Sequence, residues 1–91
     1  MRTANLDNVR AAVLKVLIHD HPHQEAQIQT LTEWHSLNEL GLLSSLTFAG
    51  LVIYLERQFG IAIPNQDYTP ARFDTLAAIT EYIQARQATQ S

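Results

Sequence analysis

An uncharged stretch in the middle of the chain limits what it can fold into. From Ser44 to Leu55 no residue carries a charge, and most residues are apolar. Ser44 can cap the start of a helix, because its hydroxyl can accept a free backbone N–H. Gly60 suits the left-handed position after a helix end, and Pro64 prevents a restart. The sequence therefore predicts a helix over residues 45–59 that is buried nearly all round or meets a partner with its outer face.

The apolar residues of this expected helix fall on more than one face. Spacing of three and four residues predicts a core stripe of Leu46, Ala49, Val52, Leu55 and Phe59. Phe48 and Leu51 are expected to pack on other helices. Ile53 and Tyr54 are candidates for an exposed docking surface. Gly50 costs about 1 kcal/mol against alanine in mid-helix, and it is either simply tolerated or allows close approach of a partner or an attached arm.

Apolar residues also recur at helical spacing over residues 5–18, where Asn5 or Asp7 can serve as the N-cap. This helix is followed by the run His19-Asp20-His21-Pro22-His23. Three histidines at alternate positions beside an aspartate could bind zinc or nickel. They also suit a solvated loop at a helix end, where histidine complements the helix dipole. We favour the loop, so no metal site is expected.

The segment over residues 24–36 is polar and long for a connection. Two capping-box patterns predict short helical turns in this region. The two patterns are Thr30 to Glu33 and Ser36 to Glu39. Trp34 is expected to lie over the bundle, with Leu37 and Leu40 covering the mouth of the core. A role of Trp34 in partner contact stays open as an alternative.

After Pro64 the pattern predicts one short and one long helical segment. Pro70-Ala71-Arg72-Phe73 reads as a short helical turn with Phe73 as its core anchor. Asp74 or Thr75 then caps a last helix. Its expected core positions are Leu76, Ile79, Tyr82 and Ile83. From Gln84 the chain is expected to fade into a polar tail.

These elements predict an all-α fold, a bundle of three long helices and one short helix with a long first loop. The 91 residues fit a single domain over 1–91, with residues 1–4 and 86–91 as flexible ends. A net charge of −3 disfavours nucleic acid, which binds basic surfaces. Because cysteine is absent, any working thiol has to come from a prosthetic group. No apolar run reaches the ~20 residues that span a membrane, and the cytoplasm is expected.

Three motifs follow one another along the expected central helix and its exit. They read Ser44-Ser45-Leu46, Leu55-Glu56-Arg57-Gln58-Phe59 and Ile61-Ala62-Ile63-Pro64. In this order and spacing they resemble the signature of the phosphopantetheine-dependent carrier proteins, the acyl and peptidyl carriers. Residues 39–43 and 68–79 are similar to the D-alanyl and peptidyl branch of that family. The resemblance implies a four-helix bundle of the acyl-carrier type.

By this resemblance Ser45 carries 4′-phosphopantetheine, which a phosphopantetheinyl transferase adds from coenzyme A. The downstream register favours Ser45 over Ser44, although both hydroxyls lie in the turn. The family has an acidic residue where this chain has Ser44, which can cap the helix but supplies no charge. The expected docking contacts are Leu46, Gly50, Ile53 and Tyr54.

A second departure from the family concerns the outer face of this helix. Carriers of fatty acid synthesis usually show acidic residues there. The corresponding outward positions are expected to be Thr47, Gly50, Ile53, Tyr54, Glu56 and Arg57. Their mostly uncharged character favours partners that dock by apolar contact.

The resemblance implies a stand-alone, monomeric carrier that catalyses nothing itself. It would hold its cargo as a thioester and present it, at high effective concentration, to an adenylating or acylating ligase and to downstream synthase or tailoring enzymes. The turn over 41–45 and the run over 73–75 favour aminoacyl or peptidyl cargo, although a fatty acid or polyketide would be tethered in the same way. Neither nucleic acid nor a membrane is expected as a partner.

Three other functions compete with the carrier. An interaction module could have kept the carrier fold and lost the arm, as serine in place of the acidic residue allows. A serine hydrolase needs a nucleophile elbow with glycines on both sides, which residues 41–45 lack. A helix-turn-helix DNA binder needs arginine, lysine or asparagine on its second helix, yet the helix after this turn is uncharged through Leu55. The carrier is therefore preferred.

Overall fold

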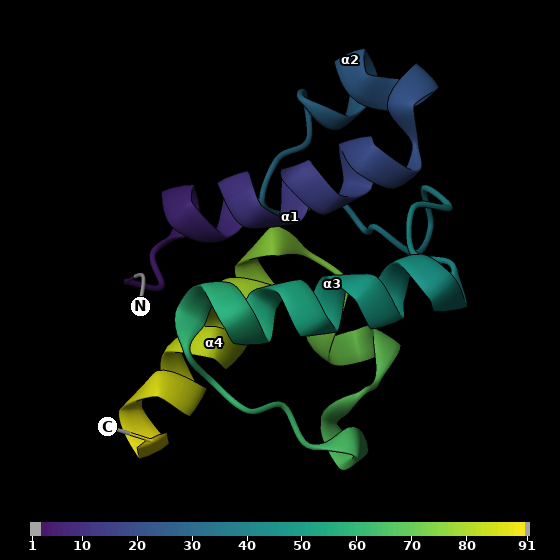
Figure 1. Cartoon of the computed structure of the whole chain (residues 1–91). Coiled ribbons are helices and arrows are strands. Elements are labelled where there is room, and N and C mark those ends of the chain that lie inside the picture. The colour runs from purple at the N-terminus through teal and green to yellow at the C-terminus, as the bar shows by residue number, and fades with distance from the viewer. Residues whose placement is uncertain (1–2, 91) are drawn as a thin grey trace.

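The computed structural model describes residues 3–90, which form helices joined by helical turns and loops (Figure 1). The long helices are α1 (Leu6–Asp20), α3 (Ser45–Phe59) and α4 (Leu76–Gln90). The shorter elements are η1 (Pro22–Gln24), α2 (Glu25–Ile28), η2 (Asn65–Asp67) and η3 (Pro70–Phe73). No strand occurs among these described residues, and the predicted all-α bundle with three long helices is confirmed. The expected flexibility of residues 1, 2 and 91 lies outside the described part.

Helix α1 packs against both α3 and α4, while η3 packs against α4. In Figure 1 α1 and α3 lie side by side and run in opposite directions, so the C-terminal end of α1 lies beside the N-terminal end of α3. Asn5 begins α1, because its side chain accepts the N–H of Asn8 at 2.8 Å. Val9, Val13 and Leu17 are buried at a spacing of four residues and give this helix its core face.

The buried face of α3 differs from the predicted one at its first turn. Its buried residues are Thr47, Leu51, Val52, Leu55 and Phe59. The predicted core positions Leu46 and Ala49 are wrong, since Leu46 is 84% exposed and Ala49 is exposed as well. Thr47, expected to face outward, is only 3% exposed. Its hydroxyl accepts a hydrogen bond from Ser44, which removes most of the cost of burying it.

The loop between α1 and α3 forms one helical turn that was not predicted and one of the two that were. The unpredicted turn lies at α2, ahead of both capping-box patterns. The pattern from Thr30 to Glu33 does not form a helical turn, because the Thr30 hydroxyl donates to the Gln27 carbonyl at 2.7 Å instead of capping. The second pattern forms a turn, in which the Ser36 hydroxyl accepts the N–H of Glu39 at 3.1 Å.

The apolar anchors of this loop divide into buried and exposed residues. Leu37 is fully buried, as predicted, whereas Leu40 is 38% exposed and covers the core only in part. The prediction that Trp34 lies over the bundle is wrong, because its side chain is 73% exposed. The backbone is held beside it, where the N–H of Ala77 donates to the carbonyl of Glu33 at 3.1 Å. The Trp34 indole is therefore exposed to solvent, while the backbone next to it is held in place.

Gly60 ends α3 in the predicted left-handed conformation, with φ of 62°. The N–H of Ile61 donates to the Glu56 carbonyl at 3.2 Å. The Glu56 carboxylate, expected to face outward, instead turns back and accepts the N–H of Ile63 at 2.8 Å. Both bonds are accepted by Glu56, so the last turn of α3 fixes the segment that follows it. Ile61 and Ile63 of this segment are buried in the core.

Thr75 is the cap of α4, because its hydroxyl accepts the N–H of Ala78 at 3.0 Å. Asp74, the other predicted cap, bonds the first loop instead. Helix α4 continues to Gln90, so the tail predicted from Gln84 is helical through residue 90. None of the helices in the described part of the chain has the length and apolar character needed to cross a membrane.

The connection that precedes α4 is anchored by one short hydrogen bond. The Tyr82 hydroxyl donates to the Asp67 carboxylate at 2.6 Å. Burial, together with this carboxylate, raises the pKa of Tyr82 to about 12. The Tyr82 ring also packs on Phe73, with ring centroids 5.2 Å apart. Elements η2 and η3 are therefore tied to one residue of α4.

Candidate functional site

The site predicted from the sequence lies where α3 begins. Ser44 is the N-cap residue, and its hydroxyl oxygen accepts the N–H of Thr47 at 3.2 Å. Ser45 is the first helical residue and is exposed. None of the described residues hydrogen-bonds its hydroxyl. Because the N–H groups of a first helical turn lack intrahelical partners, the Ser45 hydroxyl stands at the positive end of the helix dipole.

The turn before Ser44 is shaped by its backbone. Gly41 has φ of 71°, a conformation that favours glycine. The next N–H, that of Leu42, donates to the Leu37 carbonyl at 3.0 Å. Leu37 and Leu42 are both buried, and so the turn is pinned to the core on both sides of the glycine. This pinning fixes where the Ser44 cap and the Ser45 hydroxyl lie.

A small cavity of about 200 Å³ opens beside Ser45. Its lining residues are Asn38, Leu43, Ser45, Phe48, Tyr68 and Pro70. The Phe48 ring meets the Tyr68 ring edge-on, with centroids 6.0 Å apart. The cavity therefore combines the apolar surfaces of the rings and Leu43 with the side-chain amide of Asn38, and it lies directly next to the Ser45 hydroxyl.

A comparison with models of protein families matches residues 24–83 to the family described as "Phosphopantetheine attachment site". The match covers more than half of the chain, and the chain therefore belongs to this family of phosphopantetheine-dependent carrier proteins. The family attaches 4′-phosphopantetheine covalently. A search of the curated proteins finds no match to this chain.

The surroundings of Ser45 fit this group. A phosphate ester there would meet the unpaired N–H groups and the positive end of α3. The adjoining cavity offers apolar surface and an amide, which match an arm built of methylene and amide units.

The four residues expected to dock partners differ in exposure. Leu46 and Ile53 are exposed, at 84% and 50%, and Gly50 is exposed between them. Tyr54, also expected to be exposed, is half-buried. Its ring lies under the Lys15 ammonium, 5.8 Å from the ring centroid. Tyr54 therefore belongs as much to the contact between α1 and α3 as to the outer face.

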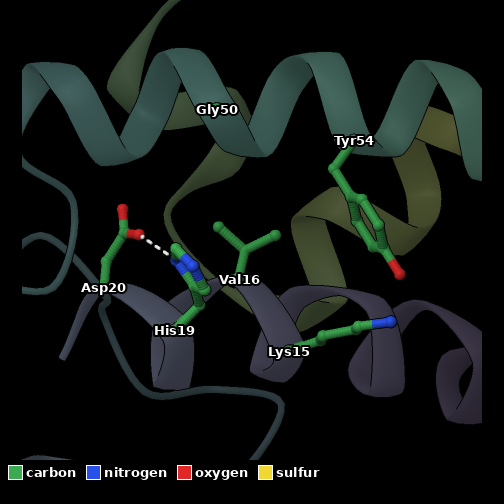
Figure 2. Close-up of a pocket in the computed structure, with 6 residues that line it drawn as sticks. All are labelled: Lys15, Val16, His19, Asp20, Gly50 and Tyr54. Carbon is green, nitrogen blue, oxygen red and sulfur yellow. Dashed lines mark hydrogen bonds and ion pairs between the residues drawn. The ribbon is translucent and has the colours of Figure 1, made fainter. Parts of the chain in front are cut away.

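A groove of about 360 Å³ lies between α1 and α3 along part of their contact (Figure 2). Its lining residues are Lys15, Val16, His19, Asp20, Gly50 and Tyr54. Gly50 forms part of one wall, and a Cβ atom built on it would meet no atom within 4 Å. The space beside Gly50 is open to solvent, so simple tolerance and close approach of a partner or an attached arm both stay predictions.

Gly50→Ala is expected to raise the free energy of unfolding by about 1 kcal/mol. Alanine loses less backbone entropy than glycine in a helix interior, and the open space accepts the methyl group without strain. Urea denaturation of both proteins, followed by circular dichroism, measures the difference. A variant less stable than the wild type would show that the space beside Gly50 does not accept a methyl group.

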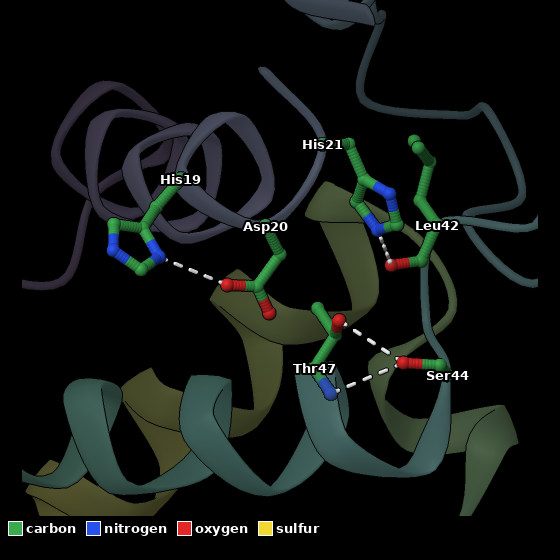
Figure 3. A network of polar contacts seen from close by, with 6 residues as sticks. All are labelled: His19, Asp20, His21, Leu42, Ser44 and Thr47. Carbon is green, nitrogen blue, oxygen red and sulfur yellow. Dashed lines mark hydrogen bonds and ion pairs between the residues drawn. The ribbon is translucent and has the colours of Figure 1, made fainter. Parts of the chain in front are cut away.

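The described contacts of the histidine run are with neighbouring protein groups. Among the described residues no group of three or more His, Cys, Asp or Glu side chains could hold a metal ion. His19 Nδ1 lies 3.0 Å from the Asp20 carboxylate, and His21 Nε2 lies 3.1 Å from the Leu42 carbonyl oxygen (Figure 3). The alternate spacing sends neighbouring histidines to different partners. The arrangement fits the loop interpretation, and the absence of a metal site stays a prediction.

Two residues near the site were missed from the sequence. Asp20 reaches the first turn of α3 from α1, and Thr47 lies between it and the cap (Figure 3). Hydrogen bonds from the side chains of His19 and Thr47 lower the pKa of Asp20 below 3.8, so this carboxylate is ionised at neutral pH. The spacing of Ser44 and Thr47 hinted at a capping contact, but no local pattern pointed to Asp20.

Proposed function

We propose that this chain is a non-catalytic carrier whose attachment residue is Ser45. The observation that supports this most directly is the exposed, unbonded Ser45 hydroxyl at the capped start of α3, inside the segment that matches the family. Ser44 stabilises the helix start and is itself engaged with Thr47. Of the two serines in the turn, Ser45 therefore has the hydroxyl that is free to react.

The residues of this chain have three tasks in such a carrier. Ser45 supplies the hydroxyl oxygen, Ser44 holds the helix start, and the cavity beside Ser45 gives an attached arm apolar surface to lie on. When bound, phosphopantetheine supplies a terminal thiol that can hold acyl cargo as a thioester. A cargo tethered in this way reaches each docked enzyme at high effective concentration.

The partners in this proposal are a phosphopantetheinyl transferase, a loading ligase of the adenylating or acylating kind, and enzymes of peptide or polyketide assembly. The turn over 41–45 and the run over 73–75 favour aminoacyl or peptidyl cargo, the cargo of the D-alanyl and peptidyl branch. Leu46 and Ile53 present apolar surface next to Ser45. Docking through them would be small in area and short-lived, as a shuttling carrier requires.

The experiment that tests this function is the intact mass of the purified protein after incubation with coenzyme A and a promiscuous phosphopantetheinyl transferase. The expected result is a gain of one phosphopantetheine, which fragmentation of the modified peptide assigns to Ser45. A folded protein that gains no mass would overturn the proposal. It would favour the alternative, an interaction module with a carrier fold.

Leu46→Asp is expected to lower the kcat/KM of the transferase for this chain about tenfold, a loss of about 1.4 kcal/mol in docking. The leucine is exposed, so unfolding free energy should change by less than about 0.5 kcal/mol. Ala26→Asp, which adds the same charge at an exposed site on α2, is the matched control. Equal rates for both variants would remove Leu46 from the docking surface.

A further inference from the structure

The first turn of α3 lacks an acidic residue of its own, yet a carboxylate faces it from another helix. Negative charge at a helix N-terminus is favourable because it complements the helix dipole. The first turn of α3 carries none. Asp20 is the last residue of α1, and the opposite directions of α1 and α3 bring it to this end of the bundle (Figures 1 and 3).

The Asp20 carboxylate lies beside the hydrogen-bonded pair of Ser44 and Thr47 at the start of α3 (Figure 3). The Ser44 hydroxyl donates to Thr47 Oγ1 at 3.1 Å. The Thr47 side chain faces the Asp20 carboxylate and helps to lower its pKa (Figure 3). The Thr47 N–H donates back to Ser44 Oγ at 3.2 Å. Because Thr47 is 3% exposed, its hydroxyl is shielded from competing water. With the carboxylate on this side, the Thr47 hydroxyl can donate towards Asp20 while it accepts from Ser44.

A second contact ties the same two parts of the chain together. His21, one residue after α1, has its Nε2 atom 3.1 Å from the carbonyl oxygen of Leu42, which lies two residues before the cap. His19 bonds the other side of the Asp20 carboxylate, at 3.0 Å (Figure 3). The end of α1 therefore holds the attachment turn at its loop and at its helix start.

We propose that Asp20 is the positioning residue of the attachment turn, and that it acts through Thr47 and Ser44 to hold the Ser45 hydroxyl for modification. This role rests on the proposed function of Ser45. An anionic acceptor at one end of a hydrogen-bonded chain polarises the hydroxyls along it. Ser44 Oγ thereby becomes a better acceptor for the helix N–H. The carboxylate from α1 supplies the charge that the serine cap cannot.

The first arm of the test is the rate of modification by a phosphopantetheinyl transferase with coenzyme A. Asp20→Asn removes the charge at nearly constant shape, and Thr47→Val removes the hydroxyl that links Asp20 to the cap. Both variants are expected to lower kcat about five- to tenfold with little change in KM, since they disturb the reacting hydroxyl rather than the docking surface. Glu25→Gln, which removes an exposed carboxylate on α2, should keep the wild-type rate.

The second arm is rescue by Ser44→Asp. An aspartate at the N-cap accepts the first-turn N–H directly and carries the charge itself. In Asp20→Asn and in Thr47→Val it is expected to restore kcat to within about twofold of the wild type. In the wild-type background the same change should give little gain, because Asp20 already supplies the charge. Equal gains in all backgrounds would show that Asp20 and the cap act independently, and would overturn the proposal.

The third arm needs no transferase. Hydrogen exchange of the Thr47 amide, followed by NMR, is expected to be several-fold faster in Asp20→Asn, while the Ile79 amide in α4 stays unchanged. Unchanged exchange at Thr47 would overturn the link from Asp20 to the cap. If the wild type is modified and Asp20→Asn has the same kcat, the role of Asp20 is overturned while the proposed function stands. Absence of modification in the wild type would overturn the proposed function, and this role with it.

Discussion

Ser45→Ala is expected to abolish the attachment of phosphopantetheine completely. The arm is joined to the protein through the oxygen of a hydroxyl, and alanine has none. The position is exposed and its hydroxyl bonds no described residue, so the variant should fold as the wild type does, within about 0.5 kcal/mol. Intact mass after incubation with coenzyme A and a promiscuous transferase measures attachment, and circular dichroism confirms the fold.

Ser44→Ala is the matched control, because it removes the neighbouring hydroxyl from the same turn. It should still gain one phosphopantetheine, but more slowly. The lost cap leaves the N–H of Thr47 without its acceptor and costs about 1 kcal/mol of stability. A mass gain that survives in Ser45→Ala and disappears in Ser44→Ala would assign the arm to Ser44 instead. That outcome would mean that the cap opens before the reaction.

The bounds of the central helix could be predicted because local chemistry decides them. Ser44 caps it and Gly60 ends it, and the structure places the helix over Ser45–Phe59 as expected. The same holds for Asn5 at the start of α1 and Thr75 at the start of α4. Capping bonds span three residues, so both partners stand close together in the sequence.

The buried face of α3 was harder to predict because apolar character alone misassigns its first turn. Leu46 is the more apolar residue, but Thr47 is the one that is buried. The threonine can enter because Ser44 bonds its hydroxyl and the Asp20 carboxylate, which comes from another helix, faces its side chain. A periodic pattern contains no information about such partners.

The first loop was the least predictable part for a related reason. Its positions are set by bonds to segments far along the chain, such as that between the Leu37 N–H and the Asp74 carbonyl at 2.7 Å. Trp34 shows the consequence, since its backbone segment is anchored near α4 while its side chain is exposed. Asp20 and Asp74 both looked like ordinary residues at helix ends.

Asp74→Ala is expected to lower the free energy of unfolding by about 2–3 kcal/mol, one of the largest losses for a single polar side chain here. One carboxylate oxygen accepts three hydrogen bonds from the first loop. The donors are the Ser36 hydroxyl at 2.8 Å, the Asn38 N–H at 3.1 Å and the Asn38 side-chain amide at 2.8 Å. Alanine leaves all three without their acceptor. Denaturation by urea measures the loss, and Glu81→Ala, at an exposed site on α4, should stay within about 0.5 kcal/mol of the wild type.

The charge of Asp74 makes this stabilisation depend on pH in a defined direction. Burial by itself raises the pKa of Asp74, but the bonds from Ser36 and Asn38 outweigh it and lower the pKa below 3.8. The carboxylate therefore contributes fully above about pH 3.8, and its contribution is lost as the pH falls through the lower pKa of the folded state. The difference in unfolding free energy between wild type and Asp74→Asn should accordingly be constant near neutral pH and shrink towards pH 2. A difference that stays constant to pH 2 would show that the shape of the side chain, and not its charge, holds the loop that leads to Ser45.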